Sequence, residues 1–221
     1  MSSLHLLLDS ADVTAWRTWL PSGLFAGVTT NPTLLRRAGL ACTLPVLDSL
    51  VTEARALGAT EIHLQAWGGD ASALLACSRE LAALSEHVLV KLPITREGAT
   101  AARALIGEGV RITFTACFEA SQLVVACALG AAYAAPYLGR LNEAGLDGHA
   151  EVLAMHRIAV AAGNGTRVLA ASLRQPADLA RLAADGVAAF TLSPTLAEAL
   201  FDQPATLAAA RQFETDARGS M

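Results

Sequence analysis

The sequence has little charge, few aromatic residues and almost no lysine. Charged residues make up 16% of the 221 residues and aromatic residues 5%, whereas 53% are hydrophobic. Such a composition predicts one compact domain with a large apolar core and excludes a disordered chain or a coiled coil. Sixteen Lys and Arg stand against twenty Asp and Glu, with no basic cluster along the chain. This balance argues against nucleic acid and against an anionic membrane surface as the main partner.

Motifs for metal binding and for secretion are missing as well. The four cysteines form neither a CxxC pair nor a metal-ligand spacing, and the five histidines show no HxH or HExxH pattern. We therefore expect neither a metal nor another cofactor. The opening segment MSSLHLLLDS is too short, and acidic too early, for a secretory signal. Together these features predict a cytoplasmic protein with free thiols.

One long uncharged stretch raises the question of a membrane span. The segment from Ala120 to Gly139 has no charged residue, but it contains Gln122, Gly130 and Pro136. These residues interrupt a continuous apolar helix, so a span is a poor explanation of the stretch. We predict a buried helix that stops at Gly130 and is followed by a buried strand.

Short apolar runs recur along the whole chain, each followed by a longer stretch with helical spacing. Their mean separation is about 26 residues, which suits one strand, one helix and two loops. Eight alternations predict a parallel sheet covered by helices and closed as a (β/α)8 TIM barrel. The eight runs are Leu4–Asp9, Gly27–Asn31, Glu61–Ala66, Val88–Pro93, Arg111–Cys117, Ala131–Tyr137, Arg167–Ser172 and Ala188–Ser193.

An open doubly wound sheet is the alternative to the barrel. That fold usually carries a glycine-rich phosphate loop after its first strand, and neither GxGxxG nor GxxxxGK[ST] occurs here. The barrel is therefore preferred, as a single catalytic domain over residues 1–201. Residues 202–221 are expected to form a C-terminal extension helix and tail, which could cross to a neighbouring subunit. Leu141–Gly148 is predicted to be a loop over the sixth strand.

Lys91 is the only lysine in the protein, and it lies inside the apolar run Val88–Pro93. Alternation along a strand places Val88 and Val90 on one face and Leu89 and Lys91 on the other. Lys91 can therefore point into the barrel while the two valines face the helices. Burial disfavours the charged amine and lowers its pKa, and a free amine can attack a carbonyl to form a Schiff base. The alternative is a lysine that reaches solvent from the end of a strand.

The same alternation predicts a polar layer at the C-terminal mouth of the barrel, where barrel enzymes place their chemistry. Seven consecutive strands supply a polar group to this layer. Each member taken alone has an ordinary structural explanation, such as a turn at Asn31-Pro32. The expected members are Asp9, Thr29, Asn31, Gln65, Lys91, Thr113, Thr115, Ala135, Tyr137 and Ser172.

Chemistry suggests a role for several of these groups. Asp9 can exchange a proton with a substrate hydroxyl during cleavage of a C–C bond, and Asn31 can orient a hydroxyl. Either Tyr137 or a water held by Gln65 and Thr115 can move the protons of the imine intermediates. A phosphate could be held near the sixth and seventh strands by Arg140, Ser172 and Arg174, although a solvated loop position is the alternative for each arginine.

These motifs together resemble the transaldolase superfamily, and within it the small fructose-6-phosphate aldolase and transaldolase-like branch. The resemblance rests on blocks in the expected order, and it runs from about Leu4 to Phe201. The most specific are the second-strand and fourth-strand blocks. The blocks are Leu8-Asp9-Ser10, Gly27-Val28-Thr29-Thr30-Asn31-Pro32, Val90-Lys91-Leu92-Pro93, Ala135-Pro136-Tyr137-Leu138-Gly139-Arg140 and Val168-Leu169-Ala170-Ala171-Ser172.

The resemblance implies a set of roles for the site. It makes Lys91 the Schiff-base residue and Asp9 the proton-transferring carboxylate. It places Thr29 and Asn31 in contact with the donor substrate, with Ala135 beside them. It also implies that Gln65, Thr115 and Tyr137 organise the catalytic water and the transferred proton. It implies that the phosphate of the acceptor is bound by Arg140, Ser172 and Arg174. The resemblance also implies a homo-oligomer, often a pentamer or decamer.

Three functions follow as alternatives. The leading hypothesis is a class I aldolase that joins a ketone such as dihydroxyacetone to an aldehyde such as glyceraldehyde 3-phosphate, because Gln65 and Tyr137 resemble the aldolase branch. The second is a transaldolase that passes the dihydroxyacetone unit between sugar phosphates, and Arg174 resembles its phosphate site. The third is a barrel without catalysis that serves as a binding or assembly module. Free dihydroxyacetone released from fructose 6-phosphate would support the aldolase over the transaldolase.

Overall fold

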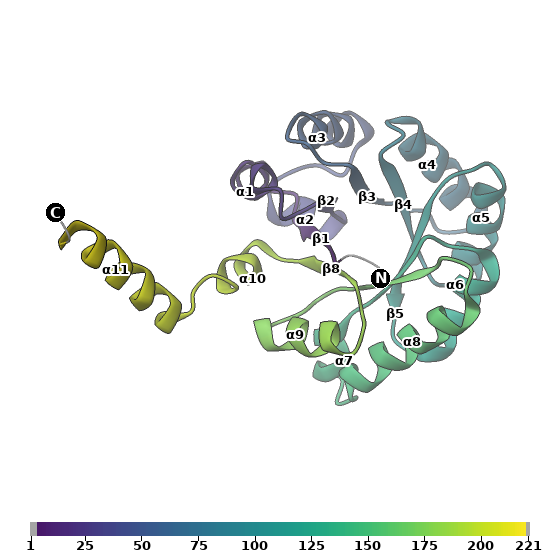
Figure 1. Cartoon of the computed structure of the whole chain (residues 1–221). Coiled ribbons are helices and arrows are strands. Elements are labelled where there is room, and N and C mark those ends of the chain that lie inside the picture. Colours follow the sequence, from purple (N-terminus) through teal and green to yellow (C-terminus); the bar gives the residue numbers. More distant parts are fainter. Residues whose placement is uncertain (1–3, 220–221) are drawn as a thin grey trace.

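The computed structural model describes residues 4–219 and shows a closed barrel of eight parallel strands, each paired with its neighbour in chain order and β8 paired with β1 (Figure 1). This confirms the predicted (β/α)8 barrel. Every predicted apolar run contains one strand. The strands are β1 (His5–Asp9), β2 (Gly27–Thr29), β3 (Glu61–Gln65), β4 (Val88–Pro93), β5 (Ile112–Cys117), β6 (Tyr133–Pro136), β7 (Arg167–Ala170) and β8 (Ala189–Leu192).

Helices surround the barrel and begin and end at ordinary signals. Asp70 and Thr95 cap their helices through side-chain oxygens, and Gly130 closes another in a left-handed conformation. The helices are α1 (Val13–Trp19), the 3-10 turn η1 (Leu20–Ser22), α2 (Pro32–Arg37), α3 (Leu44–Ala56), α4 (Ala71–Ala83), α5 (Arg96–Gly107), α6 (Ala120–Leu129), α7 (Leu138–Glu143), α8 (Gly148–Ala162), α9 (Pro176–Ala184), α10 (Pro194–Ala199) and α11 (Pro204–Gly219).

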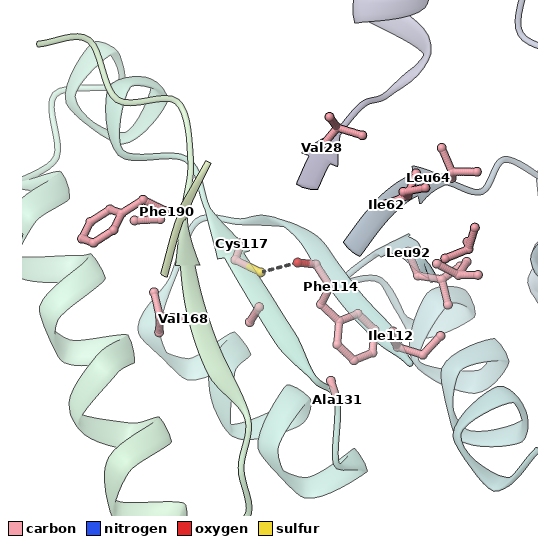
Figure 2. Close-up of a cluster of buried hydrophobic side chains, with 14 of the residues drawn as sticks. Val28, Ile62, Leu64, Leu92, Ile112, Phe114, Cys117, Ala131, Val168 and Phe190 are labelled. Atoms are coloured by element: carbon pink, nitrogen blue, oxygen red, sulfur yellow. Dashed lines mark hydrogen bonds between the residues drawn. The ribbon is translucent and has the colours of Figure 1, made fainter. Parts of the chain in front are cut away.

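The main hydrophobic core lies between the outer face of the strands and the helices. Figure 2 shows part of this cluster, including Ile112, Phe114 and Phe190. The cysteine Cys117 belongs to the same core, and its thiol contacts the carbonyl of Phe114 at 3.8 Å. Burial raises the pKa of this thiol to about 12, so it stays protonated. A second, smaller cluster fills the barrel interior and includes Leu89.

One segment differs from the sequence predictions. The stretch Leu141–Gly148 is not one loop, because its first three residues complete α7 and Gly148 begins α8. The uncharged stretch behaves as predicted, with α6 followed by β6. No helix within residues 4–219 has both the length and the apolar character that a membrane span requires.

The C-terminal helix α11 projects away from the barrel (Figure 1). It has no buried residue, and Phe213 is 71% exposed. The extension expected from residue 202 onwards is thus helical over most of its length, while residues 220 and 221 lie outside the described part. Its expected contact with a neighbouring subunit stays a prediction.

The N-terminal end of the barrel is closed by a polar network around Glu61. Its carboxylate contacts His5 at 3.0 Å and His63 at 3.4 Å, and it accepts a hydrogen bond from the Tyr133 hydroxyl at 3.1 Å. His63 is fully buried, and its second ring nitrogen lies 2.9 Å from the Thr113 hydroxyl. Burial lowers the pKa of His63 to about 4. This effect is larger than the rise in pKa that the hydrogen bond and negative charge of Glu61 cause. For Glu61 burial acts to raise the pKa, but the hydrogen bonds from both histidines lower it overall.

This network predicts that acid destabilises the protein. The folded state holds His63 neutral, so its contribution to stability is complete above pH 6.5 and is lost as the pH falls toward 4. Between pH 7 and pH 5 we expect the free energy of unfolding in urea to fall by about 2 kcal/mol on account of His63. Replacing His63 with glutamine should remove that fall, whereas His87→Gln should keep it. An equal fall in the His63→Gln variant would contradict this assignment.

Candidate active site

A pocket of about 190 Å³ opens at the C-terminal end of the barrel. Its wall is built by residues on or just after β1, β2, β4, β6, β7 and β8, where the chemistry of barrel enzymes is found. It contains most of the side chains that the sequence selected. These are Asp9, Thr29, Asn31, Lys91, Ala135, Tyr137, Arg140, Ser172 and Arg174.

Lys91 points into the barrel as predicted. It is 6% exposed and pairs in register with Gln65 of β3 and Thr113 of β5. The Nζ atom donates a hydrogen bond of 2.9 Å to the carbonyl of Thr30. Burial lowers the pKa of this amine, and the negative charge of Asp9 opposes the shift. The amine therefore loses its proton more readily than an exposed lysine does, as a nucleophile at neutral pH requires.

Asp9 is held in the pocket by threonine hydroxyls. Thr29 donates a 2.6 Å hydrogen bond to one carboxylate oxygen of Asp9, and the Thr29 hydroxyl lies 2.7 Å from that of Thr191 on β8. Thr29 thus positions Asp9 as well as lining the pocket. Thr191 was not among the predicted site residues, although Phe190 and Leu192 face the helix-side core and alternation places Thr191 inside.

Gln65 and Thr115 lie beside the lysine strand but do not border the pocket. The Gln65 amide donates to the carbonyls of Lys91 and Ala66 at 3.0 and 3.2 Å. Its oxygen accepts a 3.1 Å hydrogen bond from the Thr115 hydroxyl. These contacts tie β3, β4 and β5 together at the level of Lys91. The expected role of the pair in holding water stays a prediction.

Tyr137 is placed by an irregularity in the barrel. The register between β5 and β6 shifts between Phe114 and Cys117, and Ala116 there adopts a left-handed conformation with φ of 58°. Burial raises the pKa of Tyr137, although hydrogen bonds from the Ala116 backbone and the Thr115 side chain act against the shift. The phenol therefore stays protonated at neutral pH and can donate its proton.

Asn31 combines a structural and a site position. Its side-chain oxygen accepts hydrogen bonds from the backbone amides of Thr33 and Leu34, at 2.9 and 3.1 Å, and so caps α2. Asn31-Pro32 therefore starts a helix, with Pro32 as its first residue, and not a turn. The oxygen is committed to the cap, which leaves the amide NH₂ as the part of Asn31 able to donate to a substrate hydroxyl in the pocket.

The two arginines predicted to hold phosphate have different surroundings. Arg140 lies over the ring of Tyr137, with its guanidinium carbon 4.9 Å from the ring centroid. Arg174 forms an ion pair of 2.6 Å with Glu143 on α7. It can lie there because residue 139 is glycine, where a Cβ atom would sit 2.7 Å from the Arg174 Nε and closer still to the Ser172 carbonyl. Glu143 was not anticipated, since its segment was expected to be a loop.

In chemical terms the pocket joins a buried amine to a carboxylate, a protonated phenol and a cationic rim. This set can form an imine with a ketone, move a proton at a hydroxyl and hold an anionic end of the same molecule. Within residues 4–219 the structure contains no group of three or more His, Cys, Asp or Glu side chains that could bind a metal ion.

The model of the transaldolase/fructose-6-phosphate aldolase family matches residues 6–220. The chain belongs to this family. It is similar to a probable transaldolase of Phenylobacterium zucineum strain HLK1, with 34% identity and 96% coverage of both chains. It is also similar to probable transaldolases of Caulobacter sp. strain K31, at 34% identity and 98% coverage of both, and of Kosmotoga olearia, at 33% identity with 96% of this chain and 95% of the relative covered.

The barrel itself is shared more widely. A crystal structure of a mandelate oxidase variant superposes with a TM-score of 0.55 at 13% identity, covering 87% of this chain and 65% of that one. At this identity the likeness concerns the fold alone. Family membership makes the chain a transaldolase-family enzyme acting in sugar phosphate metabolism, which removes the support for a barrel without catalysis.

Proposed function

We propose that the protein transfers a dihydroxyacetone unit between sugar phosphates through an imine on Lys91. The observation that carries the proposal is a single buried lysine that shares its pocket with Asp9, Tyr137 and a rim of arginines. The names of the similar proteins favour transfer over simple cleavage, which was the leading hypothesis from the sequence. A cytoplasmic location and a homo-oligomeric state remain parts of the same proposal.

The proposed reaction begins at the Lys91 amine. The amine adds to the ketose carbonyl and water leaves, which gives an iminium that withdraws electrons from the adjacent C–C bond. Asp9 takes the proton of the hydroxyl on the far carbon, that bond breaks, and an aldose phosphate leaves. The electron pair stays on the lysine-bound fragment as an enamine. Attack of the enamine on a second aldose phosphate, followed by hydrolysis, completes the transfer.

Tyr137 and the residues at the pocket mouth have the remaining roles in the proposed reaction. The protonated phenol of Tyr137 supplies and recovers protons at the carbinolamine, either directly or through a water near Thr115. Arg140, Ser172 and Arg174 receive the phosphate of the aldose, and Asn31 and Thr29 face the donor beside Ala135. Gln65 acts through its contacts with the Lys91 backbone and Thr115.

The aldolase is the second candidate, and it differs only in the fate of the enamine. If the enamine is protonated by Tyr137 and hydrolysed, free dihydroxyacetone is released. Gln65 and Tyr137 favour this candidate, because both resemble the aldolase branch at the third and sixth strands. The two candidates share every step up to the enamine.

Product analysis separates the candidates. The enzyme is incubated with fructose 6-phosphate alone and then with a four-carbon aldose phosphate added. For the transferase we expect a seven-carbon ketose phosphate to form at a rate at least about tenfold above the release of free dihydroxyacetone, because a well-held acceptor outcompetes water for the enamine. Dihydroxyacetone released at the same rate with and without acceptor would instead establish the aldolase.

A further inference from the structure

The mouth of the pocket carries a third arginine that the predictions did not include. Arg37, in the last turn of α2, borders the same pocket as Lys91, Arg140 and Arg174. It follows β2, whereas Arg140 follows β6, and in a closed barrel of eight strands in chain order these two strands face each other. The guanidinium of Arg37 therefore approaches the pocket from the side opposite Arg140.

The three arginines differ in how their charge is neutralised. Arg174 is paired with Glu143, whereas Arg140 is stacked on Tyr137 and has no carboxylate partner among the described residues. Within residues 4–219 the side chain of Arg37 forms no ion pair or hydrogen bond. It also borders an adjacent cavity that contains Asp12, but no ion pair joins the two groups. The unneutralised positive charge of the mouth thus comes from Arg37 and Arg140.

We propose that Arg37 is a specificity-determining residue that binds the phosphate of the substrate from the β2 side of the mouth. This inference rests on the proposed function and extends its phosphate site to the opposite wall. Arg37 can bind a phosphate without first breaking an ion pair. Arg174 must first break its ion pair with Glu143, which lowers the net gain in binding free energy. Arg37 therefore selects phosphorylated over unphosphorylated sugars, and Arg174 contributes less than its position suggests.

The chain contains a matched control for this proposal. Arg36 precedes Arg37 on α2, is exposed in the same way and shares the last turn of the helix, but it does not border the pocket. Any benefit that a cation gives to the C-terminal end of this helix is shared by both residues. A loss confined to Arg37→Ala therefore reports on the ligand and not on the helix.

The test measures binding separately from the reaction. In a Lys91→Met background, calorimetric titration with fructose 6-phosphate is compared with titration with fructose. We expect Arg37→Ala to weaken binding of the phosphorylated sugar about tenfold, the usual effect of losing one charged hydrogen-bond partner, and Arg36→Ala to have no effect. Fructose should bind equally in all variants.

Two other outcomes are informative. If Arg37→Ala changes the affinity for fructose 6-phosphate less than twofold while Arg140→Ala weakens it, the proposal for Arg37 is overturned. Trapping of the wild-type enzyme with borohydride and fructose 6-phosphate reports separately on the proposed function. If an adduct forms but Arg37→Ala binds fructose 6-phosphate as the wild type does, the proposed function stands and the Arg37 subsite is rejected. If binding depends on Arg37 but no adduct forms, the subsite stands and the proposed function is rejected.

Discussion

Replacement of Lys91 by methionine is expected to lower turnover of ketose phosphates by more than about 10⁴-fold, because no other group in the pocket can form the imine. Within residues 4–219 Lys91 is the only lysine, so no neighbouring amine can take over. Borohydride treatment with substrate should add the reduced fragment to the wild-type enzyme, on the peptide that carries Lys91. The variant should show no added mass.

The fold should survive this replacement. Methionine has a similar length and removes an amine whose charge is disfavoured by burial, so we expect an unfolding free energy equal to or above that of the wild type. If the Lys91→Met variant is folded but inactive, the loss of activity is due to the missing amine and not to unfolding. Activity above about a hundredth of the wild-type value, or an adduct on another residue, would show that the imine is formed elsewhere.

Replacement of Tyr137 by phenylalanine is expected to lower kcat by about 10² to 10³-fold, the usual contribution of a positioned proton donor. The ring of Phe retains the edge-on contact with Phe118 at 5.8 Å and the face on which Arg140 lies. Only the hydroxyl is lost, so KM for the phosphorylated substrate should change little. Steady-state kinetics with the Phe variant measures both constants.

Tyr133 is the matched control, since the chain has only two tyrosines and both lie at β6. Tyr133 bonds to Glu61 at the opposite end of the barrel, and its replacement by phenylalanine should cost about 1 kcal/mol of stability and leave kcat unchanged. Equal losses of kcat in both variants would indicate a general effect on the barrel. A Tyr137→Phe enzyme with more than half the wild-type kcat would remove Tyr137 from the proton-transfer steps.

The sequence was most informative where a simple period governs the structure. Alternation along Val88–Pro93 placed Lys91 inside the barrel, and the same rule put Asp9 and Thr29 at its mouth. The rule would also have found Thr191, had it been applied to the last strand. Cap signals at Asp70 and Thr95 were equally reliable, because each involves backbone groups within three residues.

Contacts between distant segments could not be read in this way. The sequence does not show that Glu143 binds Arg174, because the pair is 31 residues apart and depends on a helix where a loop was predicted. Nor does it show that Arg37 reaches the pocket while Arg36 does not, since both occupy the same helix end. These differences depend on where α2 and α7 sit above the barrel.

The sequence by itself determined the (β/α)8 fold, the inward position of the single lysine and most of the polar side chains at the strand ends. Each of these follows from local periodicity, and closure of eight units brings all strand ends to one mouth. Only the tertiary structure decided which groups are already paired, namely Gln65 with Thr115, Arg174 with Glu143 and Thr29 with Asp9. Pairing changes with shifts of about an ångström in the position of side chains far apart in sequence, and no local pattern encodes such positions.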